Sequence, residues 1–206
     1  MNAGTDGGEG PFAAAIAAID AINSEDPSRE PQHGDAGGPL MPAALLYGQH
    51  MSAWLLRLDA GAPEALRLAA RAQHIARWKI PRSSYPEGRD GYLAWRSALA
   101  RFHAETAGAL LTKAGYGDDM VERVAALLQK RSLKRDADVQ TLEDAACLVF
   151  LETQFAAFAA KHPDDKVVDI LKKTAAKMSA RGLAQAALLM DRLPPAAKAL
   201  VSRALG

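Results

Sequence analysis

Two histidines, His74 and His103, flank the part of the chain that is richest in arginine and aromatic residues. Histidine titrates near neutral pH, so such a pair can supply the general acid and the general base of a hydrolysis. Arginine binds carboxylate or phosphate groups at two points, and neighbouring aromatic rings stack on a base or a sugar. This combination predicts a pocket for a phosphorylated small molecule or a nucleotide.

The positive charge of this segment is local. From Arg71 to His103 seven basic residues stand against two acidic ones, whereas the whole chain of 206 residues has a net charge of +1. The residues that we expect to contact the ligand are Arg77, Trp78, Arg82, Tyr85, Arg89, Tyr92, Arg96 and Glu143. An arginine-rich face in contact with water, beside ordinary aromatic core residues, would have the same composition. The sequence leaves both interpretations open.

Asp144 completes the predicted catalytic set with His74 and His103. It shares a helical face with Leu148 and Leu151, and a carboxylate on an apolar face needs a partner. That partner is a metal ion, a histidine or an arginine in the functional interpretation. In the structural interpretation, the segment T-L-E-D is a capping box in which Asp144 satisfies the first turn of its own helix. The two histidines have the same alternative, as buried residues that pack between helices.

Several uncommon segments follow one another in an order that resembles a known family. The segments are AQHIARWKIPRSSYP, GRDGYLAWRSAL, FHAE, QTLEDAACLVFLE and KMS. They resemble the bacterial and fungal family called domain of unknown function 4202, over a core of about residues 47–179. The resemblance implies no particular activity.

More distantly, the layout is similar to the HD superfamily of metal-dependent phosphohydrolases, which are all-α proteins. That similarity implies that His74, in the context H-x-x-R, and Asp144 hold a divalent metal ion, and that His103 acts as acid or base. The chain departs from the pattern where the His-Asp dyad should stand, because Ala94 and Trp95 occupy those places.

Three functions follow from these residues. The first is a hydrolase that acts on a phosphorylated small molecule or a nucleotide. The second is a non-catalytic module that binds a nucleotide or an anion with a degenerate metal site. The third is a scaffold for protein interactions.

The elements that must position these residues are helices, because apolar residues recur at helical spacing and no segment alternates with a period of two. The pattern predicts an all-α, HD-like, single-domain bundle of roughly eight or nine helices over residues 11–206, after a disordered stretch at 1–10. The helices are expected at 11–23, 42–58, 63–78, 90–115, 118–131, 141–162 and 163–178, with two short ones at the end. Residues 24–40, 79–89 and 134–140 are expected to be loops, the first of them a flap or a loose connection.

Composition narrows the setting. Cys147 is the single cysteine, so the chain cannot form an intramolecular disulfide, which suits a reducing compartment. No apolar run reaches the roughly 18 residues that span a bilayer, and the first residues lack the pattern of a signal peptide. We therefore expect a cytoplasmic protein with no membrane contact. The net charge is near zero, and the local positive charge lies beside aromatic residues on a short loop, which favours a pocket over a helix that reads DNA.

Overall fold

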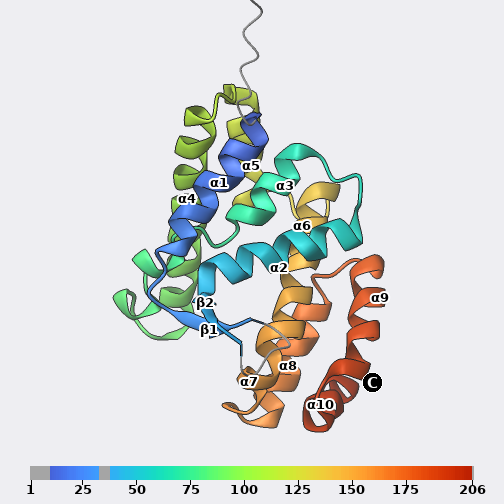
Figure 1. The fold of residues 1–206 in the computed structure, drawn as a ribbon. Coiled ribbons are helices and arrows are strands. Elements are labelled where there is room, and N and C mark those ends of the chain that lie inside the picture. Colours follow the sequence, from blue (N-terminus) through green and yellow to red (C-terminus); the bar gives the residue numbers. More distant parts are fainter. Residues whose placement is uncertain (1–9, 33–37, 206) are drawn as a thin grey trace, which may run out of the picture.

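The computed structural model describes residues 10–32 and 38–205, and within them the chain is mostly helical (Figure 1). The predicted disordered stretch at 1–10 falls outside this part except for Gly10. None of the described helices combines the length and the apolar character needed to cross a bilayer. The ten α-helices are α1 Pro11–Ser24, α2 Ala43–Leu58, α3 Glu64–Ala72, α4 Gly88–Lys113, α5 Asp118–Leu128, α6 Ala137–Val149, α7 Phe155–Ala159, α8 Asp164–Ala175, α9 Ala180–Leu189 and α10 Pro195–Leu205.

Helix α2 lies across the middle of the molecule and packs against α3 and α6 (Figure 1). Helix α3 also packs against α5, and the long α4 runs beside α5, while α8 pairs with α10. The apolar residues that set the predicted helical faces form the core: Leu66 of α3 and Leu148 of α6 are fully buried. Burial of each such side chain contributes about 1.5–3 kcal/mol to folding, which is why these faces meet.

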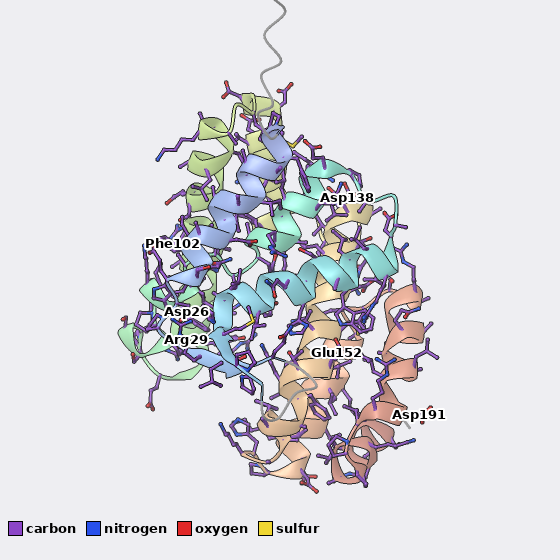
Figure 2. All side chains as sticks on the ribbon, in the orientation of Figure 1. Asp26, Arg29, Phe102, Asp138, Glu152 and Asp191 are labelled. Atoms are coloured by element: carbon purple, nitrogen blue, oxygen red, sulfur yellow. The ribbon has the colours of Figure 1, made fainter. Side chains whose placement is uncertain are left out.

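Two aspartates of the N-terminal segment attach α1 to the rest of the fold. Asp20 accepts two hydrogen bonds of 2.6 Å from the guanidinium of Arg71, which joins α1 to α3. Asp26 accepts a hydrogen bond of 2.9 Å from the amide of Ala44 and so caps α2, whose own N-cap residue is Pro42. Figure 2 shows Asp26 where the chain leaves α1.

The expected loop at 24–40 contains strand β1, Arg29–Pro31, which pairs antiparallel with β2, Leu40–Pro42. Three residue pairs are too short to give an alternating sequence pattern, so the sequence did not reveal this ribbon. The predicted helix at 141–162 is interrupted by a π-helical segment, Phe150–Gln154, which separates α6 from α7. Because α6 and α7 were predicted as one helix, the described residues contain ten α-helices, one more than the upper end of the predicted eight or nine.

Helix α3 ends at Ala72, although the apolar spacing predicted a helix to residue 78. A turn follows, in which Ala76 has a left-handed backbone with φ of 50°. Two short 3-10 turns then lead to α4, Arg77–Lys79 and Arg82–Ser84. His74 and Arg77 therefore lie on a turn and not on one face of a continuous helix.

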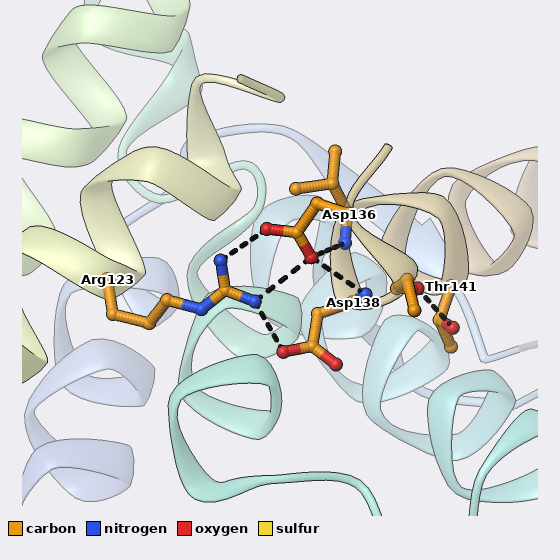
Figure 3. Close-up of polar contacts among 6 residues, drawn as sticks. Arg123, Asp136, Asp138 and Thr141 are labelled. Carbon is orange, nitrogen blue, oxygen red and sulfur yellow. Dashed lines mark hydrogen bonds and ion pairs between the residues drawn. The ribbon is translucent and has the colours of Figure 1, made fainter. Parts of the chain in front are cut away.

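Helix α6 begins at Ala137, four residues before the expected start, so the capping box at Thr141 was wrong. Asp136 is the N-cap, and its carboxylate accepts hydrogen bonds from the amides of Asp138 and Val139 (Figure 3). The same carboxylate receives two hydrogen bonds from Arg123 of α5, at 2.5 and 3.0 Å. The hydroxyl of Thr141 instead donates to the carbonyl of Ala137.

Asp136 should contribute to stability in a pH-dependent way. The hydrogen bonds from Arg123 lower the pKa of Asp136 to about 2. Because this value lies below the ordinary pKa of aspartate, the contribution is full above about pH 4 and is lost as the pH falls through 2. At pH 7, Asp136→Ala should lower the free energy of unfolding by about 1 kcal/mol or more, as measured by urea denaturation, because it removes both the cap and the ion pair. Asp136→Asn keeps the capping oxygen and should cost less, and an equal loss in the two variants would contradict the capping role.

Candidate functional site

A cavity of about 1070 Å³ lies between the N-terminal ribbon, the first half of α2, the turn after α3 and the segment from the π-helix into α7. Small-molecule sites in proteins measure roughly 300–1,000 Å³, so this cavity has room for a ligand of nucleotide size. Four of the residues expected from the sequence line it: His74, Arg77, Trp78 and Arg82.

Arg77 is the central charge of the cavity wall. Its guanidinium carbon lies 4.7 Å from the centre of the Trp95 ring, an arrangement typical of a cation stacked on an aromatic face. Among the described residues no carboxylate forms an ion pair with Arg77, and burial lowers the pKa of its guanidinium. Arginine keeps its proton in proteins, so the cavity contains a positive charge that lacks a counterion within the described chain.

His74 stacks on Tyr47 of α2, with ring centres 3.8 Å apart and planes inclined by 14°. Burial, and then the charge of Arg77, hold the pKa of His74 well below its ordinary value. The imidazole is therefore neutral at pH 7 and has a free electron pair on one nitrogen. Burial also raises the pKa of Tyr47.

Two further cations border the cavity. Arg82 donates hydrogen bonds to the carbonyls of Tyr85 and Pro86, at 2.8 and 2.7 Å, which fix the bend before α4. Carbonyl oxygens do not neutralise the guanidinium, so its charge still acts on the cavity. Lys161, just beyond α7, is an exposed residue of the lining. Glu30 of β1 is an acidic group on the lining.

The π-helical segment also contributes to the cavity lining. Its Thr153 and Gln154 line the cavity, whereas Glu152 accepts a hydrogen bond of 2.6 Å from the indole of Trp54. Figure 2 shows Glu152 where the helix passes beneath α2. The anchor to Trp54 holds the segment against α2, and π-helical turns are frequent at functional sites.

His103 is buried behind His74 and does not line the cavity. The two rings are 6.1 Å apart. Its Nδ1 lies 2.8 Å from the carbonyl oxygen of Ile75, and because a carbonyl only accepts, Nδ1 carries the proton. Its Nε2 is buried without a hydrogen-bond partner in the described part of the chain.

Glu143 and Asp144 lie away from the cavity lining and are both engaged. Glu143 forms an ion pair with Lys130, and its pKa is lowered, burial being outweighed by the lysine charges. Asp144 is fully buried and accepts hydrogen bonds from the backbone amide and the hydroxyl of Ser179, at 2.9 and 2.5 Å. A Cβ on Gly182 would lie 2.6 Å from the Asp144 carboxyl carbon, so α9 starts tightly against this carboxylate.

The other predicted contacts, Tyr85, Arg89, Tyr92 and Arg96, are not part of the cavity lining. Arg96 donates to the Tyr92 hydroxyl at 3.3 Å on the exposed face of α4. Helical spacing explains this outcome, because only Trp95 of that turn faces the cavity. The basic segment thus combines the two sequence interpretations, a cavity wall at one end and an arginine-rich exposed face at the other.

The residues do not form the metal centre that the HD resemblance implies. Over residues 10–32 and 38–205, no group of three or more His, Cys, Asp or Glu side chains is placed to hold a metal ion. His74 stacks on Tyr47, whereas the Asp144 carboxylate is occupied by Ser179 and by the amide of Gln140. These side chains do not fit a shared metal ion.

Several lining residues escaped the sequence analysis. Tyr47 and His50 lie one turn apart on α2, and Gln154, Phe158 and Lys161 recur at a spacing of four and three residues. That spacing marks one helical face, but it indicates a cavity only when the facing wall is known. His50 has an interaction of its own.

Fold and cavity together define a mostly helical protein with a cation and several aromatic rings in one pocket. A family model described as Domain of unknown function (DUF4202) matches residues 13–201, and the chain belongs to that family. No curated protein and no solved structure matches the chain significantly.

The burial of His103 leads to a prediction about its titration. Burial lowers the pKa of His103 to about 4, so its ring signals in NMR spectra should stay constant from pH 8 to about pH 5 and then shift. An unfolded histidine has a pKa of about 6.5, so the contribution of neutral His103 to stability is full above pH 6.5 and declines as the pH falls toward 4. A ring titration centred near 6.5 would contradict the buried, Nδ1-bonded arrangement.

Proposed function

We propose that the cavity binds a phosphorylated small molecule or a nucleotide through Arg77. The observation that carries this proposal is a guanidinium on the cavity wall that no carboxylate of the described chain neutralises. Removal of a charge from water is costly unless a partner compensates for it. A bound phosphate supplies that partner and accepts two hydrogen bonds from the guanidinium fork.

The aromatic residues favour a ligand that also contains a flat ring. Trp78, Trp95, Tyr47 and Phe158 all line the cavity. Arg77 stacks on Trp95 and His74 stacks on Tyr47, so we expect a base to stack on Trp78 or Phe158. Arg82 and Lys161 add charge around a phosphate group. This set supports a nucleotide more than inorganic phosphate alone.

Calorimetric titration of AMP, ADP, adenosine and inorganic phosphate tests the proposal. Replacement of Arg77 by Met keeps most of the side-chain volume and removes the charge. A hydrogen bond to a charged group is worth about 1.5–3 kcal/mol, so Arg77→Met should weaken nucleotide binding roughly 10- to 100-fold. Adenosine, which has no phosphate, should bind the two proteins equally.

Arg89→Met is the matched control, because Arg89 lies in the same basic segment but outside the cavity lining. It should bind ADP as the unaltered protein does. Equal ADP affinity in the Arg77→Met protein, or no binding of any of these compounds to the unaltered chain, would refute the proposal.

A second candidate, hydrolysis of the bound phosphate compound, is favoured by one observation. His74 is neutral and lies on the lining near Arg77. A neutral imidazole can take a proton from water while the water oxygen attacks phosphorus and the P–O bond to the leaving group breaks. The imidazolium then returns its proton to solvent or to the departing oxygen, and Arg77 can stabilise the charge on the phosphoryl oxygens. The resemblance of the H-x-x-R segment to the HD superfamily supports the same candidate, although the HD-like fold stays a prediction and His74 and Asp144 do not fit a shared metal ion.

Phosphate release from nucleotides and phosphate esters, with and without manganese, tests this second candidate. A general base contributes roughly 10²- to 10⁴-fold, so His74→Gln should reduce any turnover by at least about 100-fold. The control His162→Gln alters a histidine outside the cavity lining and should leave turnover unchanged. Binding without turnover would leave the non-catalytic module as the function.

A further inference from the structure

The peptide group between Ile75 and Ala76 is held on both of its sides by side chains from distant helices. Its carbonyl oxygen accepts a hydrogen bond of 2.8 Å from Nδ1 of His103, on α4. Its N–H donates to Oδ1 of Asn23, in the last turn of α1, at 3.3 Å. The C=O and N–H of a trans peptide point in opposite directions, so the two bonds fix the orientation of this plane.

The turn needs such support because its backbone is unfavourable. Ala76 has φ of 50° and ψ of 27°, the left-handed conformation that L-residues other than glycine rarely adopt. This conformation costs roughly 1–2 kcal/mol. If the peptide rotated, Ala76 could continue α3 as a helix, as the apolar spacing of the sequence predicts.

Both supporting side chains are buried, and each uses one polar atom for this contact. Asn23 is 1% exposed and His103 is 4% exposed. In the described part of the chain, the remaining polar atoms Asn23 Nδ2 and His103 Nε2 have no hydrogen-bond partner. Each residue thus leaves one polar atom unsatisfied at a cost, and the atom it does use is bonded to the same peptide.

The direction of this peptide determines where the next side chain goes. Arg77 follows Ala76 directly, and its guanidinium stacks on Trp95. The indole of Trp95 in turn donates to the carbonyl of Ile80, at 2.9 Å, which fixes the other end of the segment. His74 precedes the clamped peptide and stacks on Tyr47.

We infer that Asn23 and His103 are positioning residues, which clamp the Ile75–Ala76 peptide and thereby direct Arg77 into the cavity. His103 then acts through the backbone, in place of the acid or base role that the sequence suggested. The ligand-binding consequence rests on the proposed function, but the clamp itself concerns only the conformation of Arg77 and can be tested without a ligand.

The ring of Trp95 provides the direct readout. A proton above an indole face resonates upfield, so the Nε–Hε signal of Arg77 in a ¹⁵N spectrum reports whether the guanidinium is stacked. Arg77→Lys identifies that signal by its disappearance. Asn23→Ala should return the signal toward the position of a free arginine. It should also weaken ADP binding roughly tenfold, because one hydrogen bond that positions Arg77 is lost.

Two further variants separate clamping from general stability. Asp20→Ala, one turn earlier on α1, loses the bond to Arg71 but touches neither atom of the peptide, so the Arg77 signal should stay in place. Adding Ala76→Gly to Asn23→Ala should restore the signal, because glycine adopts the left-handed conformation without strain. A residue that served packing alone would not be rescued by a change at position 76.

The His103 arm uses a conservative pair. His103→Asn places an amide N–H near the position of Nδ1 and should keep the Arg77 signal, whereas His103→Leu removes the donor and should shift it. Circular dichroism establishes that each variant is folded, and the His103→Leu and His103→Asn pair carries the test if the Asn23→Ala protein does not fold.

The inference is overturned if folded Asn23→Ala and His103→Leu proteins leave the Arg77 signal in place, or if Asp20→Ala moves it as far as Asn23→Ala does. Failure of Ala76→Gly to restore the signal also overturns it. If the Arg77 signal responds as expected but no phosphate compound binds the unaltered protein, the clamp stands and the proposed function falls.

Discussion

The candidate site depends on one constraint, a helix that stops before its sequence pattern does. Helix α3 could continue beyond Ala72 on apolar spacing alone, and then His74 and Arg77 would lie on a helical face. The Ile75–Ala76 peptide group instead makes hydrogen bonds with Asn23 of α1 and His103 of α4, and these bonds favour the left-handed conformation of Ala76. The chain therefore leaves the helix, and the segment that follows becomes a cavity wall. Local propensity is outweighed here by two tertiary hydrogen bonds and by the stacking of Arg77 on Trp95.

This competition explains what the sequence could and could not predict. Apolar periodicity located the long helices, because burial of leucine faces dominates their energy, and the family was recognised from short ordered segments. The end of α3 was missed because its causes lie 53 and 28 residues away in the chain. The start of α6 was missed for a local reason: Thr141 resembled a cap, but Asp136 has both the capping geometry and an arginine partner.

The site shows the same division. Composition alone gathered His74, Arg77, Trp78 and Arg82, which line one cavity, since charged and aromatic residues are costly to concentrate without use. Composition could not separate the cavity-facing end of the basic segment from the exposed face of α4, because both contain arginine and tyrosine. Nor could it find Thr153 and Gln154, which approach the cavity only because the π-helical segment shifts the helical register between α6 and α7.

The hydrogen bonds of the charged side chains also distinguish residues that stabilise the fold from the residue that is available to a ligand. Asp144 was a predicted catalytic residue, but its carboxylate accepts a hydrogen bond from the amide of Ser179, at the start of α9. In the same way Asp26 accepts from the amide of Ala44 in α2, and Glu152 accepts from the indole of Trp54. Arg77 is different, because its charge meets an aromatic face and no carboxylate of the described residues. A fold that satisfies these three acids internally, and leaves Arg77 on the cavity wall without an ion-pair partner among the described residues, has an unmet electrostatic demand at that point. An anionic ligand is the simplest way to meet it.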